Sequence, residues 1–272
     1  MLAADLVWPL HGAPTGAFTL EDAAAAPEQA VVTAVDRPVL LGYAPETPNG
    51  RAMLILGGGG YTALMAGREG IQVARWLTAL GYHAFVLIHR FPRAATGPSA
   101  PLDDALAAMA MIRASGLAEK GLGVVGLSSG GHLAACLIAD YPAQWGTVQP
   151  QRPDLLVVGY APISTNAKGR TIIADKPPLP PLEKQALYDA LQPDAQLLPD
   201  PPPTFIIYAG NDPVVPVANA HRLHDALKAA GASPELHIFA DAPHGFALDT
   251  PDLPVSLWPR LCEAWLRQVG FL

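Results

Sequence analysis

The stretch Gly126-Leu127-Ser128-Ser129-Gly130-Gly131 decides the fold, because it joins an apolar, β-branched run to a helical pattern. The preceding run, Leu122–Leu127, is continuous and apolar, as in a buried strand of a parallel sheet. A helix is expected to start near Ser129. A serine between the two lies on a sharp turn with strained backbone angles, and small glycines two positions away on each side let such a turn pack. The pattern therefore predicts that Ser128 is presented at the carboxyl end of a strand, in front of a helix N-terminus.

Similar apolar runs and helical patterns alternate along the rest of the chain. This alternation is typical of βαβ units and predicts an α/β fold with a mostly parallel central sheet and helices on both of its faces. The expected strands are Val31–Val35, Ala52–Leu56, Ala84–His89, Leu122–Leu127, Leu155–Tyr160, Thr204–Ala209 and Glu235–Phe239. The expected helices are Ile71–Leu80, Leu102–Ala114, Gly131–Asp140, Val217–Ala230 and Val255–Val269. At 272 residues the chain fits a single large domain over residues 1–272.

Two stretches interrupt this alternation. Residues 1–30 are expected to form an irregular N-terminal arm that packs on the domain or frays. Residues 161–203 are rich in proline around one short helical piece, Leu182–Leu191. Proline at that density blocks continuous helix and strand, and an insertion after a central strand lies near the strand carboxyl ends, where ligands bind. We interpret residues 161–203 either as a small cap or lid over the site or as a stiff surface loop.

Composition and charge exclude several classes of protein. Half of the residues are hydrophobic and 15% are charged, which argues against intrinsic disorder. A formal net charge of -7 without a Lys/Arg cluster argues against a nucleic-acid partner. No apolar run reaches the roughly 18 residues of a membrane span, and the opening Met1–Asp5 lacks the features of a secretory signal. We expect a soluble, cytoplasmic protein without a membrane partner, or a periplasmic or secreted one if a signal has been removed. The sequence leaves the oligomeric state open.

The two cysteines, Cys136 and Cys262, lie in apolar helical stretches. A disulfide framework or a zinc site would need more ligands at closer spacing. Both are therefore expected to be buried free thiols, and no metal site is predicted.

A serine needs a base before it becomes a good nucleophile, and the base needs a group that orients it. Asp212 and His244 each lie in a loop directly after a predicted strand, so both should reach the edge of the sheet where Ser128 lies. Serine hydrolases built on such sheets carry these residues in this order. His244 would take the Ser128 proton as general base and return it to the leaving group, while Asp212 would fix its tautomer. The rival carboxylate Asp241 precedes His244 by only three residues, too close to reach the ring from a separate strand end, so Asp212 is preferred.

A glycine run, Gly57–Gly60, also follows a predicted strand. Glycines let backbone N–H groups come within about 3 Å of a developing oxyanion, where any Cβ would obstruct them. We predict that the N–H groups of Gly59, Gly60 and Ser129 form an oxyanion hole, with a one-residue slip to Gly58 as the alternative. A phosphate-binding loop is the competing idea. It lacks support, because no Gly-Lys-Ser/Thr follows and the G-x-G-x-x-G pattern is absent.

Three residues near these motifs are candidates for the substrate pocket: Gly58, Tyr61 and Phe246. The two aromatic rings either stack on a sugar or pack in the core. His132 lies one turn into the helix after Ser128 and is expected to be a packing or hydrogen-bonding residue behind the turn.

Together these motifs resemble the acetyl-esterase and acetyl-xylan-esterase-like branch of the α/β-hydrolases, close to the hormone-sensitive-lipase group. The resemblance covers nearly the whole chain, and its usual Ser-Ala-Gly-Gly-His reads Ser128-Ser129-Gly130-Gly131-His132 here. This change keeps the backbone donor, whereas Gly57 stands where the wider group has His and this branch often has Pro. Matching stretches include Trp8–Pro14, Leu56–Tyr61, Arg68–Gly70, Leu80–Leu87, Pro101–Asp104, Gly126–Ala134, Asp212–Pro216 and His244–Phe246. The resemblance implies the α/β-hydrolase fold and removal of small acyl groups, often acetyl, from carbohydrates or simple alcohols, without a metal or organic cofactor.

Three functions follow from these observations. The leading hypothesis is a serine carboxylic ester hydrolase that acts on small-molecule or oligosaccharide esters through an acyl-enzyme. The second is a peptidase of the prolyl-oligopeptidase kind or another amide hydrolase, although such peptidases usually add a large domain that these 272 residues do not contain. The third is a non-catalytic binding protein with the same fold, which is disfavoured because all three triad positions are filled.

Overall fold

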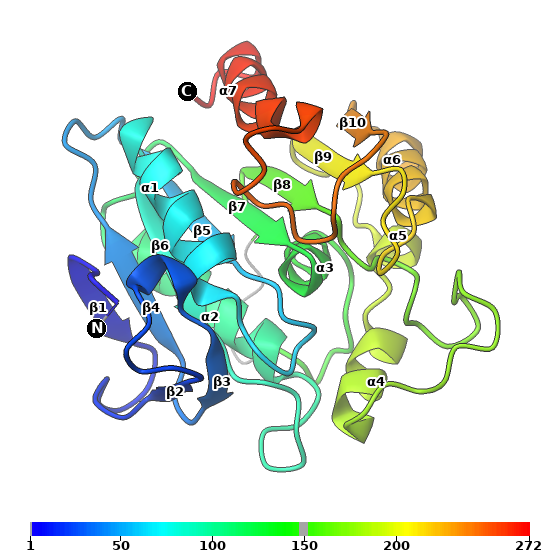
Figure 1. The fold of residues 1–272 in the computed structure, drawn as a ribbon, viewed down its shortest axis with the longest axis horizontal. Coiled ribbons are helices and arrows are strands. Elements are labelled where there is room, and N and C mark those ends of the chain that lie inside the picture. The colour runs from blue at the N-terminus through cyan, green and yellow to red at the C-terminus, as the bar shows by residue number, and fades with distance from the viewer. Residues whose placement is uncertain (1, 147–151) are drawn as a thin grey trace.

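The computed structural model describes residues 2–146 and 152–272. They form an eight-stranded sheet with helices packed around it (Figure 1). Its strands, in spatial order, are β1 (Leu6–Pro9), β4 (Val39–Tyr43), β6 (His83–Ile88), β5 (Ala52–Leu56), β7 (Leu122–Leu127), β8 (Leu155–Gly159), β9 (Thr204–Ala209) and β10 (Glu235–Phe239). The first two strands in this order are antiparallel to their neighbours, and from β6 to β10 all pairs are parallel. The predicted mostly parallel sheet is confirmed.

Helices cover both faces of this sheet, as predicted: in Figure 1, α1 lies in front of it and α2 behind it. The helices are α1 (Gln72–Ala79), α2 (Ala100–Ala114), α3 (Ser129–Cys136), α4 (Leu182–Ala190), α5 (Pro193–Gln196), α6 (Ala218–Ala229) and α7 (Trp258–Gln268). Shorter helical turns are η1 (Pro27–Gln29), the π-helix η2 (Ala66–Ile71) and η3 (Pro254–Leu257). Because both faces are covered, β5, β7, β8 and β9 are buried along their whole length.

The N-terminal arm is more regular than predicted. Within residues 1–30, β1 joins the edge of the main sheet, and β2 (Phe18–Leu20) pairs with β3 (Val32–Val35) in a separate two-stranded sheet. The expected strand Val31–Val35 is thus present as β3 but does not belong to the main sheet. The arm is held because β1 pairs with β4 and the Trp8 ring packs 5.1 Å from that of Phe85.

The proline-rich insertion, residues 161–203, carries α4 and α5 and packs back on the segment after α3. Asp140 N–H donates to Gln196 O at 2.7 Å, and Leu198 N–H donates to Ile138 O at 3.1 Å. The Tyr188 ring of α4 lies at 5.6 Å from the ring of Tyr61. The insertion therefore touches the segments that flank the glycine run and the Ser128 turn.

Both cysteines, Cys136 and Cys262, are buried free thiols, as predicted. In the described part of the chain, none of the helices combines the length and apolar character that crossing a bilayer requires.

Candidate active site

Ser128 lies on the turn between β7 and α3 with φ 52° and ψ -124°, the strained backbone that the sequence predicts. Its N–H donates to Gly159 O at 2.9 Å, which ties the turn to the neighbouring strand. The flanking glycines are required by close packing. A Cβ on Gly130 would lie 2.0 Å from Leu56 O, and one on Gly126 would lie 2.3 Å from Gly130 O. No side chain fits at either position.

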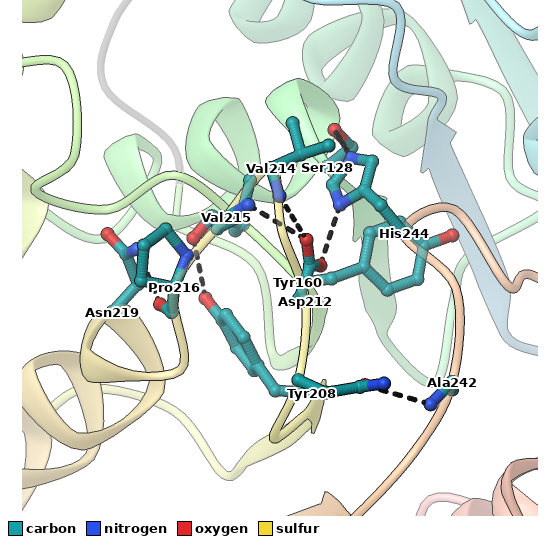
Figure 2. A network of polar contacts seen from close by, with 12 residues as sticks. Ser128, Tyr160, Tyr208, Asp212, Val214, Val215, Pro216, Asn219, Ala242 and His244 are labelled. Atoms are coloured by element: carbon teal, nitrogen blue, oxygen red, sulfur yellow. Dashed lines mark hydrogen bonds and ion pairs between the residues drawn. The ribbon is translucent and has the colours of Figure 1, made fainter. Parts of the chain in front are cut away.

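His244 stands between Ser128 and Asp212 (Figure 2). The distance from Ser128 Oγ to His244 Nε2 is 3.0 Å, and that from His244 Nδ1 to Asp212 Oδ2 is 2.7 Å. The Asp212 side chain is 0% exposed, whereas that of His244 is 21% exposed, so the ring is open to solvent only in part. The structure thus brings the three predicted residues into one hydrogen-bonded chain.

The second oxygen of Asp212 fixes the carboxylate in its loop after β9. Oδ1 accepts the N–H groups of Val214 at 2.8 Å and Val215 at 2.9 Å. The rival carboxylate Asp241 accepts a hydrogen bond from the side-chain amide of Asn211 at 2.5 Å instead. The carboxylate in contact with His244 is therefore Asp212.

These contacts select one tautomer of His244. An ionised carboxylate only accepts hydrogen bonds, so Nδ1 carries the proton that Asp212 accepts. Nε2 then has a free lone pair that can accept the Ser128 hydroxyl proton. This is the arrangement that a general base for Ser128 needs.

Two backbone N–H groups beside Ser128 are free. Those of Gly59 and Ser129 donate to no protein acceptor within residues 2–146 and 152–272. The prediction for Gly60 needs correction, because its N–H donates to Ser129 Oγ at 2.9 Å. The Ser129 hydroxyl, absent where this position is Ala, captures that donor. Of the three predicted donors, Gly59 and Ser129 therefore keep a free N–H, whereas the N–H of the alternative donor, Gly58, donates to Glu69 Oε2 at 2.6 Å.

The structure places the three residues predicted for the substrate pocket, Gly58, Tyr61 and Phe246, in the interior of the protein. All three residues are buried, with Tyr61 1% and Phe246 0% exposed. The Tyr61 hydroxyl faces His132 Nδ1 at 2.9 Å, and the Phe246 ring packs edge-on against Tyr160 at 4.5 Å. Both aromatic residues are core residues that pack against neighbours of the site.

His132 is a hydrogen-bonding residue behind the turn, as predicted. Its Nε2 lies 3.0 Å from the backbone oxygen of Leu191 and must carry the proton, so Nδ1 accepts the Tyr61 hydroxyl. Complete burial lowers the pKa of His132 to about 4. The ring therefore stays neutral and links α3 to the insertion.

Glu69 is the site residue that the sequence reasoning missed. It is 4% exposed, and burial raises the pKa of its carboxyl above the usual value, an effect that the Gly58 N–H and the Tyr160 hydroxyl oppose. The sequence signal is that Glu69 lies in Arg68–Gly70, one of the stretches that resemble the family, but this match does not show where the side chain points. Among the described residues, no three His, Cys, Asp or Glu side chains gather in a way that could hold a metal ion.

Comparison with solved structures identifies the fold. The acetyl ester-xyloside bifunctional hydrolase of Caldicellulosiruptor lactoaceticus is 29% identical and superposes with a TM-score of 0.73 over 98% of this chain and 97% of that one. MGS-M1, an alpha/beta hydrolase from a Medee basin deep-sea metagenome library, is 23% identical with a TM-score of 0.63 over 94% of this chain and 99% of that one. The chain has the α/β-hydrolase fold that its motifs predict.

Sequence comparison gives relatives of the expected kind. The acetylxylan esterase of Xylanibacter ruminicola is 28% identical over 244 residues, which are 84% of this chain and 46% of that protein. The chain thus spans about half the length of this curated relative. The sequence profile of the prolyl oligopeptidase family matches residues 97–266, which contain Ser128, Asp212 and His244. Because that match covers more than half of the sequence, the chain belongs to the prolyl oligopeptidase family.

Proposed function

We propose that this chain is a serine carboxylic ester hydrolase for short acyl groups, with Ser128 as nucleophile, His244 as general base and Asp212 as the group that orients the base. The observation that carries the proposal is the hydrogen-bonded chain from Ser128 Oγ to His244 at 3.0 Å and on to Asp212 at 2.7 Å. At the Ser128 end of this chain, the backbone N–H groups of Gly59 and Ser129 are free. Nucleophile, base and oxyanion donors are the parts that acyl transfer requires.

In the first half of the reaction, Ser128 Oγ attacks the ester carbonyl while its proton passes to His244 Nε2. Negative charge develops on the carbonyl oxygen, where the N–H groups of Gly59 and Ser129 stabilise it. Asp212 stabilises the imidazolium that forms. The tetrahedral intermediate then collapses, His244 returns the proton to the leaving alcohol, and the acyl group stays on Ser128.

In the second half, water takes the place of the alcohol. His244 Nε2 removes a proton from the water as its oxygen attacks the acyl carbonyl, and the same two N–H groups stabilise the second oxyanion. His244 then protonates Ser128 Oγ, and the acid leaves. Each proton passes through His244 Nε2, first from Ser128 to the leaving alcohol and then from water back to Ser128.

Acetylated carbohydrates are the substrate class that we propose, with simple acetyl esters as the minimal case. Support comes from the acetylxylan esterase and the acetyl ester-xyloside hydrolase named above, of which the second matches nearly end to end.

The test is a panel of p-nitrophenyl esters of increasing acyl length together with acetylated xylan oligosaccharides. We expect the highest kcat/KM for acetate and release of acetic acid from the oligosaccharides. A maximum at long acyl chains would contradict the short-acyl assignment, and failure to deacetylate the oligosaccharides would contradict the carbohydrate class.

A second candidate function is hydrolysis of peptide or other amide bonds, and the prolyl oligopeptidase family match favours it. The same triad can cleave amides, because His244 can protonate a leaving amine as it does an alcohol. Turnover of p-nitroanilides without turnover of p-nitrophenyl esters of the same acyl group would establish this candidate over the first.

A further inference from the structure

Glu69 is a buried carboxylate that the proposed reaction does not use, yet both of its oxygens bind segments of the site. Oε2 accepts the Gly58 N–H at 2.6 Å, and Oε1 accepts the Tyr160 hydroxyl at 3.0 Å. The residue lies on the π-helix η2, a local widening that is frequent at functional sites. One side chain thus joins the glycine loop after β5 to the first residue after β8.

On the first side, Glu69 fixes the loop that presents the Gly59 N–H. A Cβ on Gly58 would lie 2.5 Å from Glu69 Oε2 and 2.6 Å from Ser128 Cβ, so the carboxylate is packed against the nucleophile turn with only a glycine between. Gly58 O accepts the Met65 N–H at 2.8 Å. Because the N–H and the C=O of Gly58 are both held, the peptide that carries the Gly59 N–H cannot rotate.

On the second side, Glu69 fixes the support of the His244 ring. The Tyr160 ring stands edge-on to His244 at 5.3 Å and 75°. Tyr160 has φ 37°, a backbone conformation that a bulky residue adopts only where its surroundings impose it. Its hydroxyl is held by Glu69. The position of the ring behind His244 therefore depends on this carboxylate.

The neighbouring Arg68 extends the same connection to the loop that carries His244. Its Nη2 donates to Gly245 O at 3.2 Å, and its Nε contacts Asp249 Oδ2 at 2.7 Å. Two adjacent residues of η2 thus hold the site. Glu69 binds the glycine loop, and Arg68 binds the loop that carries His244.

The charge of Glu69 also acts on His244. Burial raises the pKa of Glu69, and the two donors that point at the carboxylate oppose this and favour its ionised form. The titratable and polar groups around His244 are Asp212 at Nδ1, Ser128 at Nε2 and Tyr160 against the ring, and Glu69 acts on it from η2. Arg68, also on η2, binds the backbone of Gly245. Glu69 Oε1 would lie 3.6 Å from a Cβ on Gly245, the residue after His244, so a negative charge on Glu69 favours the imidazolium that forms during the reaction.

We propose that Glu69 is a positioning residue for this reaction. It holds the Gly59 N–H and the His244 ring in the positions that the reaction requires, and it stabilises the charged ring. The proposal rests on the proposed function, since it assigns Glu69 a part in the same site. Glu69 does not touch the substrate, so its effect should fall on kcat rather than on KM.

The test is Glu69→Gln, which keeps the shape and an acceptor for the Gly58 N–H but removes the charge. We expect kcat for p-nitrophenyl acetate to fall about tenfold or more, with KM within about twofold of the wild type. Loss of the negative charge should also move the acid limb of the kcat/KM profile to lower pH by about half a unit or more. The rate at which a fluorophosphonate probe labels Ser128 should fall by the same factor as kcat.

Asp104→Asn is the matched control, because Asp104 is also a buried carboxylate but binds Arg90 at 2.6 Å instead of the site. It should lower stability and leave the acid limb in place. Tyr160→Phe keeps the ring and the Glu69 charge but removes the bond between them, so kcat should fall while the acid limb stays. This variant also serves if Glu69→Gln does not fold.

A folded Glu69→Gln variant with wild-type kcat, acid limb and labelling rate would overturn the proposal. A Glu69→Gln variant that loses only stability, the result expected for Asp104→Asn, would also overturn it, and so would a Tyr160→Phe variant with wild-type kcat. If the wild type takes the probe but hydrolyses no ester, the proposed function fails, and the labelling rates of the variants still decide the role of Glu69.

Discussion

Replacement of Asp212 by Asn should trap His244 in the wrong tautomer. An amide offers one acceptor oxygen and one NH2 group where the carboxylate offers two acceptors. The N–H groups of Val214 and Val215 at 2.8 and 2.9 Å demand the oxygen at the Oδ1 position, which leaves NH2 at the Oδ2 position, 2.7 Å from His244 Nδ1. NH2 can only donate, so the ring must accept at Nδ1 and carry its proton on Nε2, from where it cannot take the Ser128 proton.

The expected loss is about 10⁴-fold in kcat, the size seen when a triad histidine is held in this tautomer, or roughly 5 kcal/mol of transition-state stabilisation. Steady-state hydrolysis of p-nitrophenyl acetate measures it, with Asp241→Asn as the matched control. Asp241 contacts Asn211 rather than the ring, so its variant should stay within about threefold of the wild type. Asp212 does not set the tautomer of His244 if Asp212→Asn keeps a tenth of the wild-type kcat, or if the two variants lose activity equally.

Three further results are expected. Ser129→Ala removes the acceptor of the Gly60 N–H, so this donor becomes free for the oxyanion and kcat should rise, whereas a tenfold fall would mean that the hydroxyl itself takes part. Gly130→Ala should lower the free energy of unfolding in urea by about 3 kcal/mol or more, because its Cβ would lie 2.0 Å from a strand carbonyl. At Gly116 an added Cβ meets nothing within 4 Å, so Gly116→Ala should cost only about 1 kcal/mol for its positive φ, and equal costs at the two glycines would refute the packing argument. Because the pKa of His132 is lowered to about 4, its contribution to stability is complete above about pH 6.5 and is lost as the pH falls toward 4. From pH 7 to pH 5, the free energy of unfolding should fall by about 2 kcal/mol more in the wild type than in His132→Gln. An equal fall in both proteins would contradict the neutral buried ring.

Buried strands could be predicted closely from the sequence because their signal is local. Ala52–Leu56, Leu122–Leu127 and Thr204–Ala209 are continuous apolar runs, and each forms a strand with the predicted bounds. The edge strand β1, Leu6–Pro9, could not be predicted in this way. It is only half-buried, ends in proline, and exists because β4 offers a free edge more than 30 residues away.

The predicted triad residues meet in space because each lies directly after a strand of one parallel sheet, so topology alone brings their side chains to a common edge. The details that failed depend on contacts between distant segments. Capture of the Gly60 N–H by Ser129 joins residues 69 positions apart, and the bond from Glu69 to Tyr160 joins residues 91 positions apart. A serine or a glutamate at these positions does not by itself indicate such a partner. Burial of Tyr61 likewise depends on a distant segment, because α4 packs over it.

The central claim is that Ser128, activated by His244, is the nucleophile, and covalent labelling tests it most directly. In a fluorophosphonate probe Ser128 Oγ would displace fluoride at phosphorus while His244 accepts the proton, which gives a stable adduct. Fragmentation of the labelled peptide by mass spectrometry separates Ser128 from its neighbour Ser129. We predict one equivalent of adduct on Ser128, with none in Ser128→Ala and ester hydrolysis lost in parallel. An adduct on Ser129, no adduct on the folded protein, or full esterase activity in Ser128→Ala would contradict the account.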